Sequence, residues 1–141
     1  MKTLPDGAND VAASAQGATT ILVIDDEPDL LRMLEVVLTG AGYTVLTAPS
    51  GMEGLVRAQA EQPQLVLLDI MMEGMDGWEV LKLLKLEEST RGIPVVILSA
   101  RVEPRDKIRG LQEGAVDYVT KPFSVKRVLG TIDAILPRAP S

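Results

Sequence analysis

Five short runs of apolar and β-forming residues are spaced along the chain between Thr20 and Pro137. Each run has four to six residues and is rich in Val, Ile, Leu or Thr, which is typical of β-strands. The middle runs are apolar throughout, as expected for strands that are covered on both faces of a sheet. The pattern therefore predicts strands at residues 21–24, 44–47, 65–68, 93–98 and 117–120.

The stretches between these runs carry apolar residues at helical spacing. The first begins at Pro28, a residue suited to the first helical position, and is predicted to stop at Gly40 or Gly42. Ser50 and Glu53 have the spacing of a capping box ahead of the second helix. Three more helices are predicted: one after Asp76 and Gly77 that carries Trp78, Val80, Leu81, Leu83 and Leu84; one over residues 103–112 with a stop at Gly114; and one from Ser124 to Pro137 that buries Val125, Val128, Leu129, Ile132, Ile135 and Leu136.

Strand and helix alternate five times, which predicts a parallel sheet with right-handed crossovers. We expect an α/β fold, a doubly wound, flavodoxin-like five-stranded parallel sheet with strand order 2-1-3-4-5. Residues 1–19 are rich in Ala, Gly, Thr, Asn and Asp and lack periodicity, which favours a flexible leader. The expected organisation is therefore a leader at 1–19, one folded domain at 20–137 and a short tail at 138–141.

The composition excludes several kinds of chemistry. The chain has no Cys and no His, so thiolate nucleophiles, disulfides, imidazole metal ligands and Ser-His-Asp triads are absent. A net charge of −6 argues against a domain that grips nucleic acid by its phosphates. No apolar run approaches the roughly 20 residues of a membrane helix, so a soluble cytoplasmic protein without membrane contact is expected. The remaining chemistry must use carboxylates, hydroxyls, Lys and backbone amides.

Polar side chains follow four of the five predicted strands. Asp25 and Asp26 follow the first strand, Asp69 the third, Ser99 the fourth and Lys121 the fifth. In open parallel sheets, ligands bind at the carboxyl ends of the strands, near the point where the strand order reverses. With the order 2-1-3-4-5, these side chains are predicted to converge on one crevice.

Such a crevice suits phosphoryl transfer onto a carboxylate. Three nearby carboxylates repel one another and need a cation, and an all-oxygen ligand set favours Mg²⁺. Asp69 would be the nucleophile, Lys121 a positive charge for the phosphoryl oxygens and Ser99 a hydroxyl donor. Taken singly, each residue has an ordinary structural explanation, such as a helix cap or a solvated charge. The interpretation rests on their occurrence together at one edge of the sheet.

Four segments of the chain resemble response-regulator receiver domains. They are ILVIDDEP at 21–28, LLDIMMEGMDGWEV at 67–80, VVILSA at 95–100 and GAVDYVTKPF at 114–123. The spacing between them also agrees with that family. The resemblance covers about residues 20–137, nearly all of the predicted folded chain.

The resemblance implies a role for each matching position. Asp69 corresponds to the phosphoacceptor. Asp26 is implied as a direct metal ligand, Asp25 as a ligand acting mostly through water, and the backbone carbonyl of Met71 as a further ligand. Ser99 and Lys121 are implied to contact the phosphoryl group, and Tyr118 to be the switch residue, whose ring turns inward when Ser99 moves. The bond between Lys121 and Pro122 is expected to be cis.

The function implied by the resemblance is a phosphorylation-dependent switch of a two-component system. A sensor histidine kinase or a histidine phosphotransfer protein would supply the phosphoryl group, and Mg²⁺ would be the one cofactor. The face built from the fourth helix, fifth strand and fifth helix would then control a downstream protein or an attached output domain, and the resemblance also admits a phosphorylation-dependent homodimer. Such a domain assists its own phosphorylation and dephosphorylation and is not a metabolic enzyme.

One position departs from the family pattern. Members usually have Pro four residues after the acceptor, and this chain has Glu73 there. The loop is therefore expected to be looser and to carry an extra negative charge near the site. Met71 and Ala100 are expected to flank the acceptor, and the small Ala100 leaves room for attacking water.

Three other functions are consistent with parts of the pattern. The chain could be the input domain of a longer regulator such as a DNA-binding transcription factor, which the full reading frame would reveal. An unphosphorylated docking module would be indicated by failure to bind Mg²⁺. An aspartyl-phosphate hydrolase also uses an Asp after a strand, but such enzymes usually carry a second Asp two residues later, where this chain has Met71.

Overall fold

The computed structural model describes residues 19–101 and 103–136. It contains one five-stranded parallel sheet with the order β2-β1-β3-β4-β5, as predicted. Most of the predicted leader, and all of the predicted tail with Pro137, lie outside the described residues. The elements are β1 (Thr20–Ile24), α2 (Pro28–Gly40), β2 (Thr44–Ala48), α3 (Gly51–Glu61), β3 (Leu65–Asp69), α4 (Gly77–Leu86), β4 (Val95–Ser99), α5 (Pro104–Gln112), β5 (Asp117–Thr120) and α6 (Val125–Ile135).

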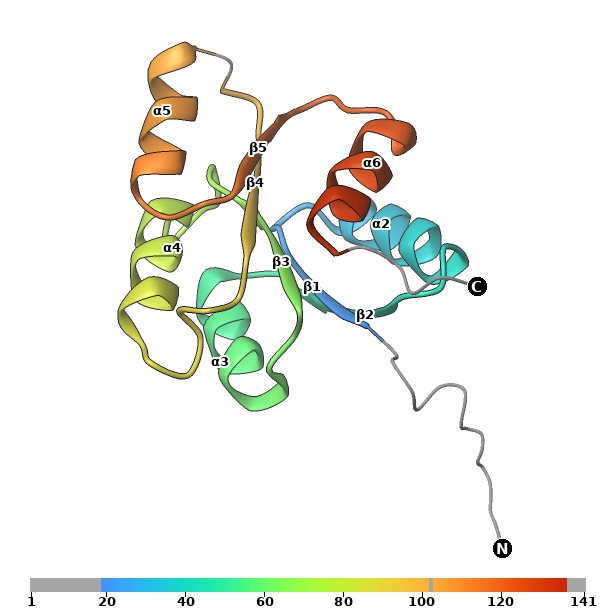
Figure 1. Ribbon diagram of the computed structural model, residues 1–141, viewed down its shortest axis with the longest axis horizontal. Helices are drawn as coiled ribbons and strands as arrows, with labels where there is room; N and C mark the ends of the chain where they lie inside the picture. Colours follow the sequence, from blue (N-terminus) through green and yellow to red (C-terminus); the bar gives the residue numbers. More distant parts are fainter. Residues whose placement is uncertain (1–18, 102, 137–141) are drawn as a thin grey trace, which may run out of the picture.

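Helices cover the sheet on both faces. In Figure 1, α2 and α6 lie on one side of the sheet, and α3, α4 and α5 lie on the other. Side chains from α2 and α6 pack with β-strand residues in one hydrophobic cluster, and side chains from α3 and α4 form a second cluster on the opposite face. Burial on both faces explains why β3 and β4 are apolar except for their last residues.

The helix ends follow the signals in the sequence. Pro28 occupies the first turn of α2, and the chain leaves that helix through Gly42 with φ of 102°. The Ser50 hydroxyl accepts a hydrogen bond from the Glu53 backbone N–H and donates to the Glu53 side chain, so the predicted capping pair forms. Gly114, with φ of 111°, follows the end of α5 as predicted. The bond between Lys121 and Pro122 is cis, which confirms that expectation.

Two details of the elements differ from the prediction. The fourth strand begins at Val95 rather than at residue 93, because Pro94 has no N–H to donate to the ladder and contributes its carbonyl to Val66 instead. Val125 is 44% exposed and was wrongly predicted to be buried. It occupies the first turn of α6, before the helix reaches the sheet, whereas Val128 and Ile132 further along are buried.

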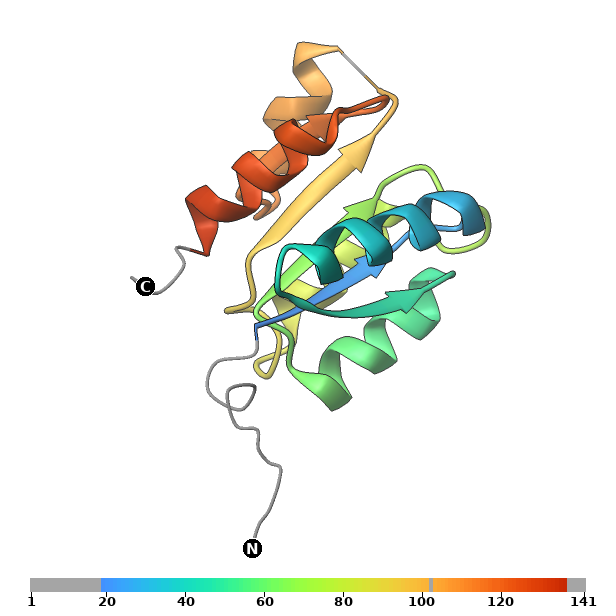
Figure 2. The same cartoon turned by 90° about the vertical axis from the view of Figure 1, so that its right-hand side faces the viewer.

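Among the described residues, no helix combines the length and the apolar character that a membrane span requires. Figure 2 shows the strand arrows running in a common direction, so that their carboxyl ends lie together at one edge of the sheet. That edge holds the polar residues singled out by the sequence.

Candidate functional site

Three aspartates meet where the strand order reverses. Asp25 and Asp26 follow β1, and Asp69 is the last residue of β3, the neighbouring strand in the sheet. Each of the three offers one carboxylate oxygen, and these oxygens all lie within 4.8 Å of one another. Asp25 and Asp69 are buried, whereas Asp26 is partly exposed. The fold therefore brings together the acidic cluster that the sequence predicted.

Lys121 reaches this cluster from the end of β5. Its Nζ lies 2.8 Å from Asp25 Oδ2, 3.5 Å from Asp69 Oδ2 and 3.8 Å from Glu27 Oε2. Burial lowers the pKa of the Lys121 ammonium, but the hydrogen bond to Asp25 and the nearby carboxylates outweigh it, and the net effect raises the pKa. Lys121 is therefore a permanent positive charge at the site.

Asp69 is held in an environment that disfavours its ionised form. Burial raises the pKa of its carboxyl to about 6, and the charge of Asp25 adds to the increase. The Met71 backbone N–H, which donates to Asp69 Oδ1 at 3.0 Å, and the ammonium of Lys121 lower the pKa but do not compensate. One ammonium group is thus insufficient for the carboxylates gathered here, and a bound cation would stabilise the ionised Asp69.

The donor set fits a hard divalent cation. Carboxylate oxygens are the ligands that Mg²⁺ prefers in proteins, and a few of them suffice because Mg²⁺ retains several waters. Asp25 and Asp26 are both fixed by backbone donors: Asp25 Oδ1 accepts from the Glu27 N–H at 2.9 Å, and Asp26 Oδ2 accepts from the Glu73 N–H at 3.1 Å. Since Met71 enters these contacts through its N–H, a metal-binding role of its carbonyl stays a prediction.

Ser99 and Tyr118 are linked to each other and to the loop after β4. Ser99 is buried, and its hydroxyl accepts a hydrogen bond from the Arg101 N–H at 3.0 Å. Tyr118 is also buried, with 4% of its surface exposed, and its hydroxyl donates to the Arg101 carbonyl at 3.1 Å. Burial raises the pKa of the Tyr118 hydroxyl, while a hydrogen bond with Ser99 opposes the increase. The aromatic ring is therefore in an inward position, with Arg101 as a backbone partner that no sequence motif indicates.

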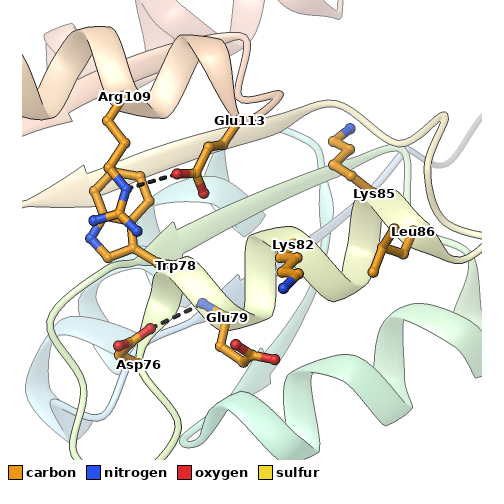
Figure 3. Close-up of a pocket in the computed structure, with 8 residues that line it drawn as sticks. All are labelled: Asp76, Trp78, Glu79, Lys82, Lys85, Leu86, Arg109 and Glu113. Atoms are coloured by element: carbon orange, nitrogen blue, oxygen red, sulfur yellow. Dashed lines mark hydrogen bonds and ion pairs between the residues drawn. The ribbon is translucent and has the colours of Figure 1, made fainter.

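A hollow lies between α4 and α5, apart from the cluster of Asp25, Asp26 and Asp69. Its volume is about 580 Å³, and its lining includes Trp78, Lys82 and Lys85 of α4. Figure 3 shows the Arg109 guanidinium stacked on the Trp78 ring, 4.0 Å from its centroid, while Arg109 also pairs with Glu113 at 2.8 Å. Trp78 of α4 thus contacts α5 through Arg109.

Comparison with known proteins agrees with this geometry. The family model described as "response regulator receiver domain" matches residues 21–133. The chain is 43% identical over 119 residues to the alkaline phosphatase synthesis transcriptional regulatory protein PhoP of Bacillus subtilis, an alignment that covers 84% of this chain and 49% of that protein. It is 42% identical over 118 residues to the DNA-binding dual master transcriptional regulator RpaA of Synechocystis, with 84% of this chain and 49% of that protein covered. The chain thus spans about half the length of these curated relatives.

Solved structures give the same result. The chemotaxis protein CheY4 of Vibrio cholerae superposes with a TM-score of 0.81 at 29% identity, covering 85% of this chain and all of that one. The N-terminal domain of a response regulator receiver protein from Methanoculleus marisnigri superposes with a TM-score of 0.70 at 40% identity, covering 87% of this chain and 100% of that one. The acidic edge of the sheet, the family match and these structures lead to one conclusion: the chain belongs to the response regulator receiver domains of two-component systems.

Proposed function

We propose that this receiver domain is a switch that is phosphorylated on Asp69. The observation that carries the proposal is the convergence of Asp25, Asp26 and Asp69 with the Lys121 ammonium at one edge of the sheet. Asp69 is the carboxylate that combines burial, a raised pKa and a contact with Lys121. These properties suit a group that becomes an acyl phosphate beside a fixed positive charge.

The transfer begins with a phosphohistidine on a sensor kinase or a histidine phosphotransfer protein. A carboxylate oxygen of Asp69 attacks the phosphorus, the bond between phosphorus and the imidazole nitrogen breaks, and its electron pair returns to the imidazole, which takes up a proton. Lys121 holds the phosphoryl oxygens by its charge, and Ser99 donates a hydrogen bond to them. Mg²⁺, when held by Asp25, Asp26, Asp69 and the Met71 carbonyl, supplies charge neutralisation.

The phosphoryl group then shifts the balance between two states of the domain. The Ser99 and Tyr118 hydroxyls both form hydrogen bonds with the backbone of Arg101, in the loop between β4 and α5. A movement of Ser99 toward the phosphoryl group therefore changes the contacts of that loop and of α5. The face formed by α5, β5 and α6 would present the change to a downstream protein, an attached output domain or a second copy. Loss of the phosphoryl group to water returns the switch to its resting state.

A longer regulator is the second proposal, compatible with the first. The matched relatives named as transcriptional regulators are about twice as long as the matched segment. In this proposal residues 20–137 form the input domain, preceded by a leader at 1–19, and an output domain lies elsewhere in the full protein. Sequencing the complete reading frame would identify an output domain or show that none is encoded.

The phosphorylation proposal is tested by intact mass after incubation with acetyl phosphate. We expect one added phosphoryl group in the presence of Mg²⁺ and none in the presence of a chelator. Borohydride reduction, which converts an aspartyl phosphate to homoserine, followed by peptide mapping, is expected to mark residue 69. Absence of the adduct, together with failure to bind the beryllium-fluoride mimic, would favour an unphosphorylated docking module instead.

A further inference from the structure

The loop after β3 is tied to the loop after β1 by a backbone hydrogen bond. The N–H of Glu73 donates to Asp26 Oδ2 at 3.1 Å, and the two residues are 47 positions apart in the sequence. Within the described residues, it is the one hydrogen bond found for the Asp26 carboxylate. Asp25 and Asp69, by contrast, have both a backbone donor and the Lys121 ammonium.

Asp26 is therefore the carboxylate of the cluster whose orientation is least constrained. It is partly exposed, and it follows a strand rather than lying in one. A free carboxylate in such a place rotates and faces water, since its two carboxylate neighbours repel it. The Glu73 N–H removes that freedom while one oxygen of Asp26 stays within the 4.8 Å cluster.

The residue type at position 73 decides whether this bond exists. A proline has no N–H, so it could not make the contact, whereas any other residue could. Glu73 adds a second effect, because its exposed side chain lines a hollow of about 720 Å³ together with Asp26, Glu27 and Asp29. Both effects increase the attraction of this edge for a cation.

We propose that Glu73 is a positioning residue for the metal site, which acts through its backbone N–H on Asp26 and, more weakly, through its carboxylate charge. Preorganised ligands bind more tightly because less freedom is lost on binding. The consequence for Mg²⁺ rests on the proposed function, but the hydrogen bond itself does not.

The two effects are separated by three substitutions. Glu73→Gln and Glu73→Ala remove the charge and keep the N–H, while Glu73→Pro removes both. We expect calorimetric titration of the metal-free protein to show Mg²⁺ binding weakened about threefold in Glu73→Gln and Glu73→Ala, with the loss disappearing at high salt. We expect Glu73→Pro to bind at least about tenfold more weakly than wild type at any salt concentration. If Glu73→Pro binds Mg²⁺ as Glu73→Ala does, the N–H has no such role and the proposal is wrong.

Amide hydrogen exchange tests the bond in a protein without proline. In the metal-free wild type, the Glu73 amide is expected to exchange more slowly than an exposed loop amide, and Asp26→Ala is expected to abolish that protection while other loop amides keep their rates. Equal exchange of the Glu73 amide in both proteins would overturn the proposal. If the wild type bound no Mg²⁺ but the protection were present, the metal role and the proposed function would fail while the hydrogen bond stood.

Discussion

Asp69→Asn is expected to abolish the phosphoryl adduct and, in the metal-free protein, to raise the free energy of unfolding by about 2 to 3 kcal/mol near neutral pH. The loss of the adduct follows because the amide is not a nucleophile for phosphorus. The gain in stability follows because burial and Asp25 raise the pKa of the Asp69 carboxyl to about 6, so ionising it in the folded protein costs free energy. The residue proposed to carry the chemistry is thus one that destabilises the resting fold.

The sign of the pH dependence follows from the same pKa. The folded protein holds the Asp69 proton at pH values where the unfolded chain, with its ordinary pKa of 3.8, has lost it. Wild-type stability is therefore expected to fall, relative to Asp69→Asn, as the pH rises from about 4 to about 6, and the difference to be constant above that. Urea unfolding of both proteins with a chelator present measures the difference at each pH. A difference that does not change with pH would contradict the assignment.

Two controls define the Asp69 effect. Added Mg²⁺ is expected to reduce the stability difference, because a bound cation compensates the buried charge in wild type and has less to compensate in the variant. Glu88→Gln removes an exposed carboxylate from the turn between α4 and β4. That variant is expected to leave both the adduct and the stability essentially unchanged.

Gly77→Ala is expected to destabilise the domain by about 3 kcal/mol, because there is no room for a methyl group at this position. A Cβ on Gly77 would overlap the backbone carbonyl oxygen of Asp69 and the Cα of Ile70. Both contacts are with backbone, and the Gly77 N–H also donates to the Ile70 carbonyl at 2.9 Å, so neither side can move freely. The end of β3 that carries Asp69 would have to shift, so slower phosphorylation is expected together with the loss of stability.

Gly130→Ala is the matched control for this prediction. Gly130 lies in α6, is exposed, and has nothing within 4 Å of a Cβ built on it. The same chemical change is therefore expected to stabilise the protein by about 0.5 to 1 kcal/mol, since Ala favours a helix over Gly. Denaturant unfolding of the two variants measures both effects. Equal changes in the two variants would show that close packing at Gly77 does not govern its role.

The strands and the acidic site could be predicted from the sequence because both depend on side chains. Continuous apolar runs mark strands that are buried on both faces, and parallel pairing then places Asp25, Asp69 and Lys121 at one edge. What escaped prediction depends on backbone atoms or on distances between elements. The hydrogen bonds of the Glu73 N–H and the Arg101 carbonyl have no sequence signal. Every residue except proline has a backbone N–H, and every residue has a backbone carbonyl.

The contact between α4 and α5 escaped for a related reason. Trp78 lies on the partly buried side of its own helix, so its spacing is that of an ordinary packing residue. Its partner Arg109 is on another helix, and only the packing of both helices against the sheet sets their separation. For Val125 the prediction was wrong in the other direction, since a residue expected to be buried is exposed. Helical spacing alone does not reveal that the first turn of α6 lies beyond the sheet.

The stacking of Arg109 on Trp78 has a practical consequence, because Trp78 is the only tryptophan of the chain. Since the chain has one indole, indole fluorescence comes from one place, the contact between α4 and α5. When the indole is excited selectively, a change in its emission would report the displacement of the Arg109 guanidinium from the Trp78 ring. The protein thus carries its own optical probe of helix α5, and stopped-flow fluorescence after addition of Mg²⁺ or beryllium fluoride would test whether that helix moves, without an attached dye.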